Sequence, residues 1–241
     1  MPIFKTEVNK PVRQAPGRPD RTLAEQAADA ILQAIARGVF LPGDPMIELY
    51  IARDLGFSRV PVREALRRLE SLGIVDSGSP RHCARLIEPT QRDVDELIEL
   101  RRTLEVMALR HALACRDNPS RWQTMRHGVA EGRPAARARD QGRMLTADRL
   151  FHRGLWEASG NALLLTSLTQ LAQRQLVMWS AVRDSMAFDT AQTEHEAILA
   201  AIEGNAIDEA ERLLSAHVRW HREIDITQAL EAAREKRALM G

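Results

Sequence analysis

The stretch LGFSRVPVREALRRLESLGIV, residues 55–75, holds four arginines. Its apolar residues recur at the spacing of one helix face, which predicts a short helix with one buried side. Arg59, Arg63 and Arg67 follow one another at intervals of four residues along the edge of that side. Such a stripe has two interpretations, a solvated helix surface or a contact with the phosphates and base edges of DNA.

The residues around this helix favour the second interpretation. Thr22 and Glu25 have the spacing of a capping box, which starts an upstream helix that Gly38 is expected to end. A second short helix is predicted over residues 47–55, and Ser58 is positioned to cap the arginine helix. Downstream, SGSPRHCARLI, residues 77–87, has the pattern of a turn between two short strands. Helices joined by a short turn and followed by a hairpin are typical of a winged helix-turn-helix, a DNA-binding fold.

Charge and composition agree with this interpretation. Residues 1–87 hold 13 Lys and Arg against 10 Asp and Glu, whereas residues 88–241 hold 21 against 23. A basic head on a mildly acidic body fits a nucleic-acid partner for the head. The two cysteines, Cys83 and Cys115, do not form a disulfide framework, so we expect a cytoplasmic protein.

No apolar run approaches the roughly 20 residues of a membrane span, and no membrane association is expected. Residues 1–20 lack the apolar core of a signal peptide and are expected to form a flexible arm.

The predicted fold class is mainly α. Residues 21–87 are expected to form the winged helix-turn-helix, and residues 88–241 an all-α bundle of six helices. Breaks at Gly, Asn and Pro separate the expected helices of the bundle, which lie at about 91–115, 119–137, 141–159, 162–185, 190–203 and 206–237.

Four residues of the bundle have the chemistry of a divalent metal site. Asp148 and His152 are four residues apart and share a helix face, whereas His195 and His217 belong to the last two predicted helices. Three imidazoles and a carboxylate suit zinc, with nickel and manganese as alternatives, and leave a coordination position for a ligand. Asp and His also pair on solvated helix surfaces, so the spacing alone leaves that alternative open.

The remaining functional signals of the bundle are weaker. No Gly-rich phosphate loop and no pair of nucleophile and base occurs, so the chain is not expected to be an enzyme. Trp156, Trp179 and Met178 are expected to pack in the core or to line a cavity.

Residues 42–75, PGDPMIELYIARDLGFSRVPVREALRRLESLGIV, resemble the winged helix-turn-helix signature of the GntR superfamily of transcriptional regulators. The resemblance extends over roughly residues 22–87. It implies that the arginine helix contacts operator DNA and that the wing residue His82 approaches the minor groove. Cys83 stands where wings of this family commonly carry Gly. The residues expected at the DNA are Ser58, Arg59, Val60, Arg63, Arg67 and His82.

The bundle resembles the FCD effector domain of the FadR subfamily in its metal-binding form, over about residues 90–235. The resemblance rests on DRLFH at 148–152, on EHEAI at 194–198 and on His217. It implies that Asp148, His152, His195 and His217 are the metal ligands.

Arg101 matches a family arginine that points toward the ligand cavity, where its guanidinium would pair with a carboxylate of the effector. Its alternative is an ion pair with Glu105 on the helix surface. Six helices resemble the VanR-like branch of the subfamily, which implies a small organic acid rather than an acyl-CoA as effector.

Together these features predict a dimeric transcriptional regulator, a repressor, that binds operator DNA and responds to a small carboxylate. A dimer is expected because one winged helix covers a half-site and a two-fold protein matches a pseudo-palindromic operator. Two alternatives are a metal-dependent enzyme acting on a small carboxylate and an architectural DNA binder with a purely structural body.

Overall fold

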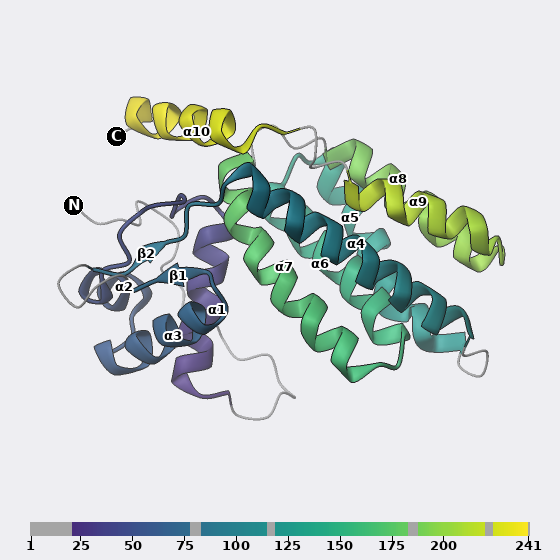
Figure 1. Cartoon of the computed structure of the whole chain (residues 1–241), viewed down its shortest axis with the longest axis horizontal. Coiled ribbons are helices and arrows are strands. Elements are labelled where there is room, and N and C mark those ends of the chain that lie inside the picture. Colours follow the sequence, from purple (N-terminus) through teal and green to yellow (C-terminus); the bar gives the residue numbers. More distant parts are fainter. Residues whose placement is uncertain (1–20, 78–82, 115–118, 183–187, 220–223, 241) are drawn as a thin grey trace. The chain divides into compact units, whose positions relative to one another are not determined.

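The computed structural model describes residues 21–77, 83–114, 119–182, 188–219 and 224–240. The protein is mainly helical, as predicted, and a two-stranded hairpin follows its third helix (Figure 1). The chain divides into two compact units. One contains residues 1–90, 173–183 and 226–241, and the other contains residues 91–172 and 184–225.

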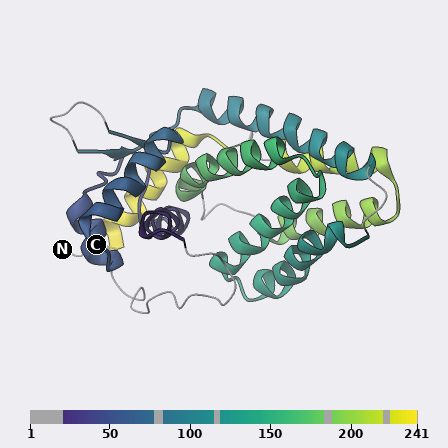
Figure 2. The same cartoon turned by 90° about the horizontal axis from the view of Figure 1, so that it is seen from below.

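The N-terminal unit is built on three helices and the hairpin. These elements are α1 (Leu23–Ala36), α2 (Glu48–Leu55), α3 (Arg59–Ser71), β1 (Val75–Asp76) and β2 (Arg85–Leu86). The strands pair antiparallel and run side by side in Figure 2, with Val75 opposite Leu86. Apolar faces of the three helices form the core, where Ile31, Ile51 and Leu69 are fully buried. The arrangement is the winged helix-turn-helix expected from the sequence.

Local signals set the ends of these helices. Thr22 and Glu25 form the predicted capping box, because each side chain bonds to the backbone N–H of the other residue. Gly38 and Gly56 adopt positive φ after the first two helices, where a side chain would be strained. Ser58 precedes α3 as predicted, but its hydroxyl does not accept a capping hydrogen bond, so the expected side-chain cap is wrong.

The last predicted helix, 206–237, is wrong as a single element. It is two helices, α9 (Ile207–Arg219) and α10 (Ile226–Met240), with residues 220–223 outside the described ranges. The part of the chain described between residues 91 and 240 therefore holds seven α-helices rather than six.

Helix α10 belongs to the N-terminal unit, although the sequence assigned residues 88–241 to one domain. Arg234 donates hydrogen bonds to Glu88 at 2.9 Å and to the carbonyl of Pro42 at 3.0 Å. Arg237 forms an ion pair with Asp44. Helix α10 is therefore bonded to the turn that precedes α2 and to Glu88.

The second unit is a helical bundle. Its elements are α4 (Gln91–Ala114), the short 3-10 helix η1 (Pro119–Trp122), α5 (Gln123–Arg137), α6 (Gln141–Ala158), the first half of α7 (Ala162–Val182), α8 (Phe188–Glu203) and α9. Phe151, Leu155, Leu214 and Ile198 are among the buried residues of its main core. No helix within the described ranges is both long and apolar enough to span a bilayer.

Two glycines bring α5 and α6 into close contact. A Cβ on Gly154 would lie 2.3 Å from the backbone nitrogen of Met125, and one on Gly128 would lie 2.5 Å from the backbone nitrogen of Phe151. Real side chains do not approach backbone so closely, so each helix needs a residue without a Cβ where the other crosses it. This crossing fixes α6, which carries two of the predicted metal ligands.

Candidate functional site

The residues predicted to contact DNA begin at the N-terminus of α3. Ser58, Arg59, Val60, Arg63 and Arg67 are exposed, while Val62, Ala65 and Leu69 on the opposite side are buried. Val60 keeps 62% of its surface exposed. His82 lies outside the described residues.

Glu48, at the start of α2, is the partner of two of these arginines. Arg63 donates two hydrogen bonds to its carboxylate, at 2.9 and 3.0 Å, and Arg59 lies 3.5 Å away. The hydrogen bond from Arg63 lowers the pKa of Glu48, and the same pair raises the pKa of Arg63. The guanidinium that the sequence predicts at the DNA is thus paired with a carboxylate of its own unit.

The four predicted metal ligands come together inside the bundle from three helices. Asp148 and His152 lie on α6, His195 on α8 and His217 on α9, and one donor atom of each lies within 4.8 Å of all the others. The Nε2 atom of His217 is 3.0 Å from Nε2 of His195 and 3.2 Å from Nε2 of His152. The Asp148 carboxylate is 3.6 Å from His195 and 3.8 Å from His152.

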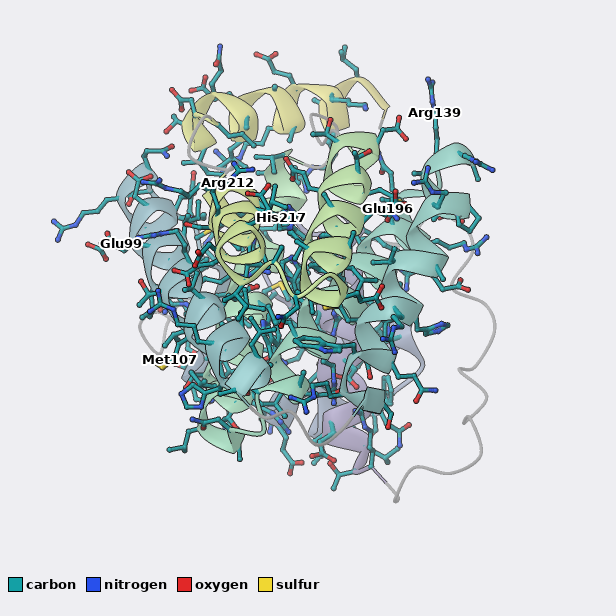
Figure 3. The ribbon with its side chains drawn as sticks, turned by 90° about the vertical axis from the view of Figure 1, so that its right-hand side faces the viewer. Glu99, Met107, Arg139, Glu196, Arg212 and His217 are labelled. Carbon is teal, nitrogen blue, oxygen red and sulfur yellow. The ribbon has the colours of Figure 1, made fainter. Side chains whose placement is uncertain are left out.

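The three imidazoles are buried, and Asp148 is partly exposed. In Figure 3 His217 is labelled near the centre of the view, whereas Glu99 and Arg139 extend outward at its edges. Phe151 is fully buried and stacks on the ring of His195, with 3.9 Å between ring centroids. The alternative of a solvated Asp and His pair on the helix surface is therefore excluded, because His152 is 3% exposed.

Two carboxylates contact the imidazoles at Nδ1, on the side of each ring away from the cluster. Glu105 of α4 lies 2.8 Å from Nδ1 of His152, and Glu194 of α8 lies 2.7 Å from Nδ1 of His217. Histidines that bind metals commonly donate their second ring N–H to a carboxylate in this way. No role was predicted for Glu194, although it directly precedes His195. Glu105, one helical turn after Arg101, was predicted only as a surface partner of that arginine.

The ring nitrogens are arranged so that a cation could be bound between them. A neutral imidazole carries one proton, and Nδ1 of His152 and of His217 faces a carboxylate that can only accept a hydrogen bond when ionised. With the protons on Nδ1, the Nε2 atoms of both rings carry lone pairs that face each other at 3.2 Å. A divalent cation between the two rings would be coordinated by both lone pairs.

A proton is a poor candidate for that cation. Burial lowers the pKa of His152, and burial together with His217 and His152 lowers the pKa of His195 well below its usual value. Three buried imidazole nitrogens and one carboxylate oxygen form a donor set that fits a divalent transition metal.

Arg101 is buried rather than exposed. It is 4% exposed, and its Nε donates to Glu105 at 2.6 Å. The ion pair with Glu105 exists, but the expected helix-surface setting is wrong because Glu105 is fully buried. Burial alone would raise the pKa of Glu105, yet Arg101 and His152 outweigh it and lower that pKa to about 2. Glu105 therefore joins the arginine to a histidine of the cluster.

Sequence comparisons identify both parts of the chain. Residues 96–219 match the model of the FCD domain, and residues 23–79 match that of the bacterial regulatory proteins of the gntR family. A probable D-xylose utilization operon transcriptional repressor of Paenarthrobacter nicotinovorans is 31% identical over 82% of this chain and 86% of its own length. The Nta operon transcriptional regulator of Aminobacter aminovorans is 29% identical over 76% of this chain and 84% of its own length.

Solved structures share the fold. McbR/YncC of E. coli has a TM-score of 0.75 at 23% identity, covering 87% of this chain and 99% of its own. A transcriptional regulator from Rhodococcus sp. RHA1 has a TM-score of 0.68, also at 23% identity, covering 87% of this chain and 98% of its own.

Proposed function

The chain belongs to the GntR family of bacterial transcriptional regulators that carry an FCD domain, and from this premise we propose that it is a dimeric repressor whose operator binding is controlled by a small carboxylate. The gntR domain implies DNA binding and the FCD domain a small-molecule effector. The carboxylate binds at a metal ion held by Asp148, His152, His195 and His217. The protein acts on DNA in the cytoplasm.

One observation carries this proposal, the convergence of three buried imidazole nitrogens and the Asp148 carboxylate beside the buried Arg101. The metal, zinc in our proposal with nickel or manganese as alternatives, supplies a Lewis-acidic position for a carboxylate oxygen. Arg101 supplies a fixed positive charge in a low-dielectric setting, where a guanidinium pairs strongly with a carboxylate. A neutral ligand would gain little from either group.

The DNA side of the proposal rests on the exposed face of α3. Ser58, Arg59, Val60, Arg63 and Arg67, together with His82 of the wing, are proposed to contact the operator. Arg63 and Arg59 read base edges or phosphates after exchanging Glu48 for DNA. Since one head covers a half-site, two copies of the chain bind a two-fold operator.

Effector control is a shift between conformations that differ in operator affinity. By linkage, a carboxylate that weakens operator binding by some factor is itself bound more weakly by that factor in the presence of operator. The proposal therefore predicts reciprocal effects, which a protein with a purely structural bundle would not have.

The experiment uses the zinc-loaded full-length protein and a DNA site obtained by affinity selection from a random-sequence library. Fluorescence anisotropy would measure operator affinity during titration with acetate, glycolate and malonate. We expect a carboxylate to lower affinity for operator, and a chelator or the substitution Arg101→Gln to abolish the response. Arg102→Gln is the matched control, because Arg102 is the next residue along α4 and its guanidinium lies 3.4 Å from Ser215.

Unchanged operator affinity under all three carboxylates would contradict effector control, and turnover of a carboxylate by the metal-loaded protein would favour an enzyme.

For the DNA interface, Arg63→Ala should weaken operator binding and lower the slope of log affinity against log salt by about one if Arg63 contacts a phosphate. Arg37→Ala, an exposed arginine at the end of α1, serves as control. Sedimentation equilibrium tests the dimer.

A further inference from the structure

Trp156 holds a buried hydrogen-bond donor with no acceptor in the protein. Its indole Nε1 is the one fully buried side-chain nitrogen or oxygen without a hydrogen-bond partner among the described residues. The residue as a whole is 4% exposed. An indole N–H can only donate, and buried donors in native proteins nearly always find an acceptor, so an unpaired one requires an explanation.

Trp156 lies beside the candidate metal centre. It follows His152 by four residues and Asp148 by eight on α6, so the three side chains project from the same side of that helix. The indole and the His152 ring have centroids 6.2 Å apart. The guanidinium carbon of Arg101 lies 5.9 Å from the indole ring. The residue that carries the unpaired donor therefore lies beside Arg101 and a predicted metal ligand.

Packing alone does not account for a tryptophan at this position. The ring contributes to the main apolar core of the bundle. A phenylalanine would fill much of the same volume without burying an unpaired polar group. The N–H is thus the feature that distinguishes Trp156 from an ordinary core aromatic, and an acceptor brought in by a ligand would satisfy it.

We propose that Trp156 is a specificity-determining residue, and that its indole N–H donates a hydrogen bond to an oxygen of the bound effector. The inference rests on the proposed function, because it requires the effector to bind beside Arg101 and the metal ligands. The Trp156 N–H would be a third polar partner of the effector, beside Arg101 and the metal ion. The ligand is a small carboxylate that carries a further oxygen, as a hydroxy acid or a dicarboxylate does.

The place of Trp156 along α6 gives this ligand class. The carboxylate group of the ligand is expected to face the ion and Arg101. A second oxygen-bearing group of the ligand would reach the Trp156 N–H, which lies on a later turn of α6 than either metal ligand of that helix. A site whose buried donor stays unpaired with the wrong ligand discriminates strongly against that ligand. The position therefore selects against monocarboxylates.

The test compares zinc-loaded wild-type protein with Trp156→Phe by calorimetric titration with acetate, glycolate and malonate. We expect Trp156→Phe to weaken binding of glycolate and malonate about tenfold, the effect of losing a hydrogen bond to a polar or charged oxygen. Binding of acetate should change less than twofold. Trp122→Phe, which removes an indole from the same apolar core, is the matched control and should change none of the three.

A second readout uses the wild-type protein and does not depend on how the variant folds. In ¹⁵N-labelled protein the indole N–H signal of Trp156, assigned by elimination with Phe variants of the other three tryptophans, should shift when glycolate or malonate is added. It should shift much less with acetate.

The outcomes separate the two proposals. Equal affinities of wild type and Trp156→Phe for all three probes, with an unmoved indole signal, would overturn the role of Trp156 and leave the proposed function intact. An equal loss for acetate would overturn the further-oxygen requirement. No binding of any probe to the zinc-loaded wild type would count against the proposed function itself.

Discussion

Replacing Glu105 by Gln removes a buried negative charge while keeping the shape of the side chain. Glu105 accepts a hydrogen bond from Arg101 at 2.6 Å and lies 2.8 Å from Nδ1 of His152, and all three residues are buried. Glutamine retains one oxygen acceptor. That oxygen cannot accept hydrogen bonds from Arg101 and His152 with the geometry of a carboxylate. The NH₂ group of the glutamine would face one of these two donors. The substitution therefore removes the carboxylate that pairs with Arg101.

The order of magnitude of this loss follows from the burial of the pair and from the direction of the Glu105 pKa shift. Removing one partner of a buried ion pair costs about 3–5 kcal/mol, because the remaining charge stays buried. The pKa of Glu105 lies at about 2, against 4.5 for an ordinary glutamate, a difference that corresponds to about 3 kcal/mol in favour of the ionised form. Since the pKa is lowered in the folded state, this contribution is present in full above pH about 4.5 and therefore at neutral pH. We expect Glu105→Gln to lower the free energy of unfolding by about 3 kcal/mol.

The substitution should also weaken the metal site. Loss of a carboxylate that orients a metal-binding histidine typically reduces metal affinity about 10- to 100-fold. Urea unfolding of the chelator-treated protein at pH 7 would measure the first effect, and a competitive zinc titration the second.

Glu99→Gln is the control, because Glu99 lies on the same helix and points outward (Figure 3). An unfolding free energy within about 0.5 kcal/mol of wild type, the range of surface substitutions, would refute the buried ion pair. Unchanged zinc affinity would refute the orienting role of Glu105.

Three further predictions concern other parts of the molecule. Gly154→Ala should lower the free energy of unfolding by about 2–3 kcal/mol, because its Cβ would meet the Met125 backbone. In urea unfolding, Gly142→Ala on the same helix, which meets only the Asp140 side chain at 3.5 Å, should be neutral or stabilising; equal effects would contradict the close crossing. Chelation of zinc should lower the melting temperature of wild type in a scanning calorimeter but not that of His217→Ala. Glu48→Gln should raise affinity for random-sequence DNA in anisotropy titrations, since Arg63 loses its orienting carboxylate. The ratio of operator affinity to random-sequence affinity should fall. An unchanged ratio would exclude an orienting role for Glu48.

The sequence predicted the fold well wherever a local signal sets an element. Three such signals depend only on neighbouring residues, and the structure confirms them. They are the capping box at Thr22, the glycines after the first two helices and the apolar face of the arginine helix. The break between α9 and α10 was missed because no Gly or Pro marks it. Arg234 and Arg237 of α10 pair with residues about 150 and 190 positions away in the sequence. The periodicity of apolar residues does not predict such distant contacts.

The candidate site divides in the same way. The geometry bringing Asp148, His152, His195 and His217 together agrees with the prediction, but their role as metal ligands and the DNA contacts of α3 stay predictions. Burial could not be predicted for Arg101, because a spacing of four residues to Glu105 is the same on a surface and in a core. The unpaired N–H of Trp156 is likewise a property of the packed structure.

A carboxylate beside an arginine recurs at both candidate sites, and burial decides what the pair can do. The pair of Glu48 and Arg63 is exposed, and exposed ion pairs contribute about 0–1 kcal/mol, so phosphates or base edges of DNA can displace the carboxylate at little cost. If this pair were buried and worth several kcal/mol, DNA binding would have to overcome it. The pair of Glu105 and Arg101 is buried, so separating it would leave an uncompensated charge, and it stays formed while ligands come and go. The same chemistry thus gives an exchangeable ion pair on the face proposed to contact DNA and a buried, lasting ion pair beside the predicted metal ligands.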